Sequence, residues 1–140
     1  MAANLFKELL KKIRPQDADQ WLVESAGTWT ENGRLAAVGA NLAMTAYGID
    51  LSSHRSQVVT KELIEKFNLI LVMEYGHRES LRIEFPQDSK KIFLLSEMTG
   101  AKYEINDPIG GHDSDYQASA RQIQNLLEEG QAAIIRLACI

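Results

Sequence analysis

The sequence has a single cysteine, Cys139, and acidic residues outnumber basic ones. One cysteine cannot form an internal disulfide, so we expect the chain to reside in a reducing cytoplasm. The net charge of -4 argues against a nucleic-acid backbone as the main partner. No apolar stretch approaches the length of a membrane span, and the first residues have no signal-peptide pattern. No histidine has metal-ligand spacing to another histidine or to Cys139, so we expect no zinc site.

One unbroken apolar run stands out in the middle of the chain. Leu69 to Met73 shows no alternation with polar residues, which predicts a strand covered on both faces. Such a strand needs helices on either side and parallel neighbours, so the fold class is α/β. Ligands of open parallel sheets bind at the carboxyl ends of the strands, so we expect any chemistry beside Met73 and Glu74. The length of 140 residues predicts one domain over 1–140.

The other patterns predict a helix at the start of the chain and an alternation of strands and helices after it. In chain order they are a helix over 1–13, a strand over 21–25, a helix over 35–47 ended by Gly48, a short turn capped by Thr60, a helix over 76–85, a strand over 92–95, and a final helix capped by Asp113 or Ser114. The first helix begins at Met1 without a capping side chain. Either this helix end frays, or the chain starts inside an element that begins upstream.

Asp107 is the strongest candidate for a catalytic side chain. The following Pro108 holds it in an extended conformation, and Gly110 and Gly111 allow the backbone to pass close to a ligand. A partly desolvated carboxyl group at the edge of a pocket has a raised pKa and can donate a proton to a leaving oxygen. The alternative is an ordinary Asp-Pro turn that leads into a helix.

Three other residues are of types that occur in functional sites. His54 could orient a neighbouring loop, or it could be a solvated loop histidine. Trp29 follows a predicted strand and could line a substrate pocket, or it could pack against the adjoining helix. Cys139 lies at the C-terminal end of a helix, where the dipole disfavours a thiolate, so we interpret it as structural.

Four motifs occur in an order that resembles the low-molecular-weight protein tyrosine phosphatase family in a bacterial form. Each motif is weak alone, but together they cover nearly the whole chain. They are Ser25-Ala26-Gly27-Thr28, Gly48-Ile49-Asp50-Leu51-Ser52 with His54-Arg55-Ser56, Leu69-Ile70-Leu71-Val72-Met73-Glu74 with His77, and Asp107-Pro108-Ile109-Gly110-Gly111.

The resemblance implies a three-layer open parallel sheet of the phosphotyrosine protein phosphatase I type and a cysteine phosphatase that uses no metal or cofactor. Its substrate is a phosphotyrosine protein or a small aryl phosphate. Asp107 matches the general acid, and His54 resembles a histidine that braces the phosphate loop. Trp29 and Ile109 correspond to substrate-binding positions. Because Ile109 and Gly110 replace the tyrosines of other members, we expect no control by tyrosine phosphorylation there.

The sequence departs from the family at the nucleophile. It contains no Cys-X5-Arg loop, and its first residues resemble those that directly follow that loop. We therefore expect an N-terminal truncation, a sheet that lacks its first, interior strand of the usual four, and an inactive 140-residue chain. Two rivals remain. A thiol-dependent arsenate reductase of the same fold would need further cysteines, and a non-catalytic pseudophosphatase would lack the main phosphate grip.

Overall fold

The computed structural model describes residues 1–28 and 31–139 of the chain. They form two compact units, a first unit of residues 1–58 and 108–124 and a second unit of residues 59–107 and 125–140. Helix α5 (Asp113–Ala138) begins in the first unit and ends in the second. In the described part of the chain, no helix is both long and apolar enough to cross a membrane.

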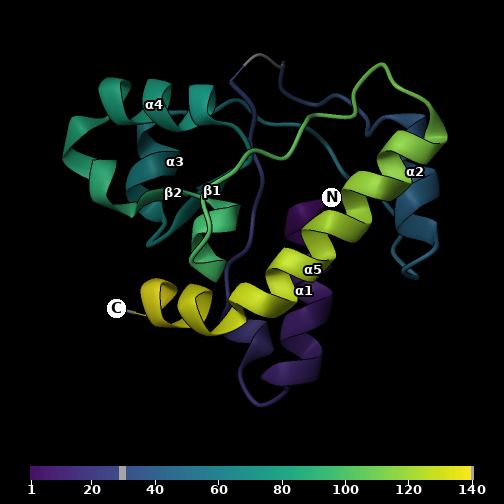
Figure 1. The fold of residues 1–140 in the computed structure, drawn as a ribbon, viewed down its shortest axis with the longest axis horizontal. Coiled ribbons are helices and arrows are strands. Elements are labelled where there is room, and N and C mark those ends of the chain that lie inside the picture. The colour runs from purple at the N-terminus through teal and green to yellow at the C-terminus, as the bar shows by residue number, and fades with distance from the viewer. Residues whose placement is uncertain (29–30, 140) are drawn as a thin grey trace. The chain divides into compact units, whose positions relative to one another are not determined.

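The second unit is built around a parallel pair of strands. Strand β1 (Ile70–Val72) pairs with β2 (Ile92–Leu94) in the register Ile70 to Ile92. Parallel strands require a crossover, which α4 (Tyr75–Glu84) and the 3-10 helix η2 (Pro86–Lys91) provide. Helix α4 packs against both strands, as Figure 1 shows. The predicted α/β class with a parallel sheet is therefore confirmed.

Both strands lie where the apolar runs predicted them, but their burial differs. Ile92 and Leu94 of β2 are fully buried, at 0% exposure. All three residues of β1 are only half-buried, so the prediction of a strand covered on both faces is wrong. Among the described residues, β1 has one hydrogen-bonded neighbour, β2. A strand with a single neighbour keeps its other flank uncovered by sheet.

Two further helices in the second unit follow their local signals. Helix α3 (Lys61–Lys66) begins at Thr60, whose hydroxyl accepts the Leu63 amide at 3.1 Å, as predicted. The 3-10 helix η3 (Leu95–Thr99) directly follows β2 and includes Leu95, the last residue of the strand predicted over 92–95. It ends at Gly100, which has a φ of +85°.

Helix α5 includes both residues that are predicted to cap it. Asp113 is its first residue, so neither Asp113 nor Ser114 is the cap. Instead, the Asp115 carboxylate accepts the His112 amide at 2.9 Å. This is the half of a capping box in which an acid in the first turn reaches back to the cap residue. Leu126, Leu127 and Ile134 of this helix are buried.

In the first unit, α1 (Ala2–Ile13) forms where a helix over 1–13 is predicted, and it buries an apolar stripe. Leu5, Phe6, Leu9 and Leu10 are buried, and no side chain caps the helix at Met1. After the 3-10 helix η1 (Ala18–Gln20), the Trp21 ring packs edge-on against Phe6, with ring centroids 5.9 Å apart. Helix α2 (Val38–Thr45) is shorter than predicted and is followed by Gly48 with a left-handed φ of +72°, as expected.

The strand predicted over 21–25 is not formed. Trp21 has an extended backbone, but residues 21–26 pair with no other strand among the described residues. The first ladder contact comes later, at an isolated parallel bridge between Gly27 and Val58. Extended residues form a strand only when a neighbouring segment completes their backbone hydrogen bonds. In the first unit, such a neighbour is present only at the bridge between Gly27 and Val58, among the described residues.

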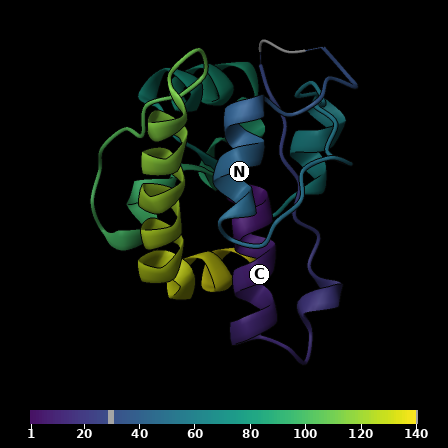
Figure 2. The same ribbon diagram turned by 90° about the vertical axis from the view of Figure 1, so that its right-hand side faces the viewer.

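Gly39 of α2 allows close packing against α5. The Tyr116 ring lies directly over its backbone, and a β-carbon at position 39 would clash with three ring atoms. Tyr116 is itself buried, so the ring has little room to move. The two helices lie side by side in both views of the ribbon (Figures 1 and 2).

We therefore expect Gly39→Ala to destabilise the fold. Alanine in a helix normally stabilises by about 0.5–1 kcal/mol relative to glycine, but overpacking a buried contact costs about 1–3 kcal/mol. The matched control is Gly76→Ala in α4, where a β-carbon meets nothing within 4 Å. Chemical denaturation should give a lower midpoint for Gly39→Ala and an unchanged or higher midpoint for Gly76→Ala. Equal midpoints for the two variants would refute the packing argument.

Candidate active site

The segment that carries Asp107 returns to the end of β1. We call residues 100–107 the Asp107 loop. The Ile105 amide donates a hydrogen bond to the Met73 carbonyl oxygen at 2.9 Å, directly after the last residue of β1. Ile105 is buried, at 2% exposure, which holds this contact in place. Asp107 follows two residues later and is exposed. The Asp107 loop thus lies at the carboxyl end of a parallel strand, where ligands of open α/β sheets bind.

The residues after Asp107 form the predicted tight turn. The Gly111 amide donates to the Pro108 carbonyl oxygen at 2.8 Å. Gly110 has a φ of +79°, a conformation that side chains other than glycine rarely adopt. Ile109, at the tip, is 73% exposed. The turn therefore presents an apolar side chain to solvent two residues from the candidate acid.

His54 lies in a braced connection of the first unit. Its amide donates to the Leu51 carbonyl oxygen at 3.0 Å. The Arg55 guanidinium donates to the carbonyl oxygens of Ser52 at 2.9 Å and of His54 at 2.8 Å. Sequence reasoning missed this role of Arg55, because a guanidinium that bonds to nearby carbonyls has no sequence signature of its own. The loop is thus held largely by its own backbone and Arg55.

The environment of His54 favours its neutral form. Burial lowers the pKa of His54 below its usual range, and the positive charges of the chain's amino terminus, Lys7 and Arg55 lower it further. A neutral imidazole keeps one donor and one acceptor nitrogen, so it can orient a neighbouring group by hydrogen bonds.

The predicted site residues belong to different compact units of the fold. Asp107 belongs to the second unit, whereas His54 and Ile109 belong to the first. Trp29 lies outside the described residues. Cys139 directly follows α5 and is exposed. Between residues 1 and 139, leaving out 29 and 30, no group of three or more His, Cys, Asp or Glu side chains is arranged to hold a metal ion.

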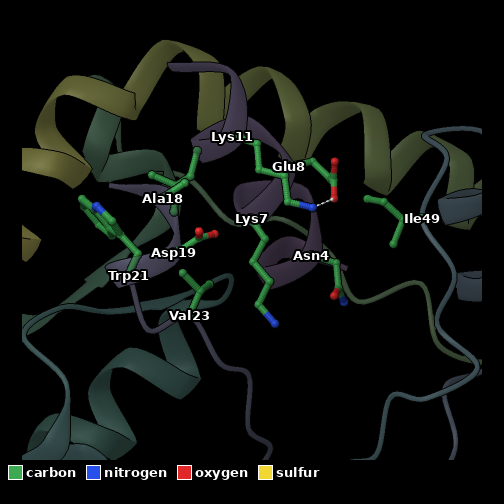
Figure 3. A pocket seen from close by; sticks show the side chains of 10 residues that line it. Asn4, Lys7, Glu8, Lys11, Ala18, Asp19, Trp21, Val23 and Ile49 are labelled. Carbon is green, nitrogen blue, oxygen red and sulfur yellow. Dashed lines mark hydrogen bonds and ion pairs between the residues drawn. The ribbon is translucent and has the colours of Figure 1, made fainter. Parts of the chain in front are cut away.

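A hollow of about 240 Å³ lies beside α1 in the first unit. Figure 3 shows the Lys11 ammonium directed at the Glu8 carboxylate, at 2.9 Å, while Lys7 extends beside that pair. Neither Asp107, His54 nor Ile109 lines this hollow. Its lining residues are Asn4, Lys7, Glu8, Leu10, Lys11, Ala18, Asp19, Trp21, Val23 and Ile49.

The lowered pKa of His54 predicts how protonation affects folding. The folded chain releases the proton of His54 more readily than the unfolded chain, whose histidine has a pKa of about 6.5. The unfolded chain therefore binds more protons as the pH falls, so the stability contributed by His54 is complete above about pH 6.5 and is lost below it. Titration of the His54 ring by NMR should give a pKa below the usual range.

Two lysine variants test the electrostatic part of this shift. Lys7→Met removes one of the positive charges that lower the His54 pKa, so it should raise that pKa. Lys11→Met is the matched control, since Lys11 lies one helical turn away and pairs with Glu8. Equal His54 pKa values in both variants would contradict the assignment of Lys7.

Comparison with known proteins gives a consistent group of relatives. The family model described as low molecular weight phosphotyrosine protein phosphatase matches residues 1–136. A protein-arginine-phosphatase of Geobacillus stearothermophilus is 32% identical over 107 residues, covering 76% of this chain and 72% of that protein. A probable low molecular weight protein-tyrosine-phosphatase, EpsP, of Ralstonia nicotianae is 31% identical over 102 residues, covering 73% of this chain and 69% of that protein.

Solved structures of phosphatases also resemble this chain. The YwlE arginine phosphatase from Geobacillus stearothermophilus has a TM-score of 0.84 at 28% identity, covering 96% of this chain and 84% of that one. A low molecular weight protein tyrosine phosphatase from T. tengcongensis has a TM-score of 0.85 at 28% identity, covering 94% of this chain and 88% of that one.

Proposed function

The chain belongs to the low molecular weight phosphotyrosine protein phosphatase family, and on this premise we propose that it hydrolyses phosphotyrosine in proteins or small aryl phosphates, with Asp107 as general acid. The hydrogen bond from Ile105 to Met73 carries the proposal, because it ties the Asp107 loop to the carboxyl end of β1. An exposed carboxyl group at that edge is accessible to a substrate. His54 is proposed to brace the phosphate loop, and Trp29 and Ile109 to contact the substrate.

The reaction has two steps. A cysteine thiolate attacks phosphorus, so that an S–P bond forms and the P–O bond to tyrosine breaks, while Asp107 gives its proton to the departing phenolate oxygen. Asp107 then takes a proton from water as the water attacks phosphorus, which breaks the S–P bond and releases phosphate and the thiolate. Transfer of a proton by a placed side chain contributes a rate factor of about 10² to 10⁴.

The attacking thiolate is not among the 140 residues. The chain has no Cys-X5-Arg sequence, and its one cysteine, Cys139, directly follows the C-terminal end of α5. We therefore propose that the 140-residue chain alone is inactive. An extended form, made by adding a strand and a Cys-X5-Arg loop ahead of Met1, is proposed to be active.

Phosphoarginine is the second candidate substrate. Two relatives at 30% identity or more, from Geobacillus stearothermophilus and Bacillus subtilis, are named protein-arginine-phosphatases. A guanidine leaving group needs a proton as a phenolate does, so the role proposed for Asp107 is the same. The two substrates differ in the shape and charge of the group beside Ile109, and this difference is measurable with matched phosphopeptides.

We expect the extended form to hydrolyse a phosphotyrosine or phosphoarginine peptide and the 140-residue chain to hydrolyse neither. In the extended form, Asp107→Asn should lower kcat by about 10² to 10⁴, because the leaving group loses its proton donor. Asp113→Asn is the matched control, since Asp113 is another exposed aspartate a few residues away. Initial rates measured with both peptides give these values.

Three outcomes would count against the proposal. Absence of turnover in the extended form, with retained binding of phosphopeptide, would favour the pseudophosphatase. Reduction of arsenate by the extended form would favour the arsenate reductase. A kcat for Asp107→Asn equal to that of Asp113→Asn would remove Asp107 from its role as general acid.

A further inference from the structure

Helix α4 is capped by a residue of the Asp107 loop rather than by its own neighbour. The first amides of a helix lack partners within the helix. Glu74, the N-cap residue, makes no side-chain capping bond. Instead, the Glu104 carboxylate accepts the Tyr75 amide at 2.9 Å. A negative charge at this helix end also interacts favourably with the helix dipole, so Glu104 joins the loop to the start of α4.

Tyr75 makes a second connection to the same loop. Its hydroxyl group donates to the Lys102 carbonyl oxygen at 2.9 Å. The Arg78 guanidinium lies over the Tyr75 ring, 5.1 Å from its centroid. Arg78 is buried and forms ion pairs with Glu79 and Glu97, which fix its position. The Tyr75 side chain is thus held on its face and at its tip.

Two more contacts complete the attachment of the loop. The buried Ser96 hydroxyl donates to the Tyr103 carbonyl oxygen at 2.7 Å and accepts the Tyr103 amide at 3.0 Å. The Ile105 amide bonds to the Met73 carbonyl oxygen. Four consecutive residues, 102 to 105, are therefore each fixed to Met73, α4 or η3 within the second unit.

We propose that Glu104 and Tyr75 are positioning residues that hold Asp107 where it protonates the leaving group. This inference rests on the proposed function of Asp107. A residue spans at most about 3.6 Å of chain, so the Asp107 backbone stays within about 7 Å of the Ile105 anchor. Release of the preceding residues would let the carboxyl group move, and a misplacement of about 1 Å can cost 10² in rate.

The kinetic test uses the extended form and two substrates with different leaving groups. A phosphotyrosine peptide needs the proton from Asp107, whereas p-nitrophenyl phosphate needs it less, because nitrophenolate is a more stable anion. Glu104→Ala should lower kcat for the peptide by about 10-fold to 10²-fold, with a smaller loss for p-nitrophenyl phosphate and an unchanged KM. Glu104→Gln, which keeps an acceptor oxygen, should recover part of the loss. Tyr75→Phe should lower kcat for the peptide by a smaller factor than Glu104→Ala does.

Glu129→Ala is the matched control, since Glu129 is an exposed glutamate on α5 in the same unit. Asp107→Asn, measured in parallel, separates the two claims. If Asp107→Asn does not lower kcat more for the peptide than for p-nitrophenyl phosphate, the assignment of Asp107 as general acid is wrong. With that effect present in Asp107→Asn but absent in Glu104→Ala, the positioning role is wrong. An equal loss on both substrates in Glu104→Ala would indicate general damage to the fold and would also overturn the positioning role.

Amide hydrogen exchange on the 140-residue chain tests the attachment without any turnover. Glu104→Ala should speed exchange of the Ile105 amide by about 10-fold or more, as expected when a fixed segment opens locally. The amides between β1 and β2 should exchange as in the original chain and in Glu129→Ala. An Ile105 amide that exchanges at the same rate in Glu104→Ala would overturn the inference.

Discussion

The hydrogen bond between the Ile105 amide and the Met73 carbonyl oxygen is the constraint on which the candidate site depends. It joins the Asp107 loop to Met73, which directly follows β1 at the carboxyl end of the strand. Because the Ile105 side chain is buried, moving the loop away would expose apolar surface and also leave a carbonyl without its partner. The location of Asp107 therefore follows from the packing of the residue two positions before it.

Local sequence signals were sufficient where a single segment determines its own structure. The apolar run at Ile92 formed a strand, Thr60 capped α3, and Gly48 and Gly110 took left-handed conformations. The prediction of a strand over 21–25 is wrong for a physical reason. Its residues are apolar enough for a strand, but a strand is a property of two segments, and the partner is not visible in the composition of one.

The same division applies to the candidate site. The tight turn after Asp107 could be predicted from the Asp-Pro and Gly-Gly pairs, whereas the contacts of Glu104 and Tyr75 could not. Their two hydrogen bonds join residues 29 and 27 positions apart, and each partner is an ordinary polar residue in sequence. A glutamate near an Asp-Pro turn has no local feature that predicts it will cap a different helix. Only the fold, in which α4 lies between the parallel strands β1 and β2 in the chain, brings these segments together.

The proposed reaction needs a nucleophile and an acid, and the 140 residues contain a candidate only for the acid. The nucleophile and the phosphate grip require a Cys-X5-Arg loop, which the 140 residues do not contain. The proposed acid, Asp107, requires an ordered loop, and residues 102 to 105 of this loop bond to Met73, Tyr75 and Ser96 of the second unit. These contacts involve no residue of a phosphate loop. The attachment of the Asp107 loop beside the end of β1 is therefore a property of these residues themselves.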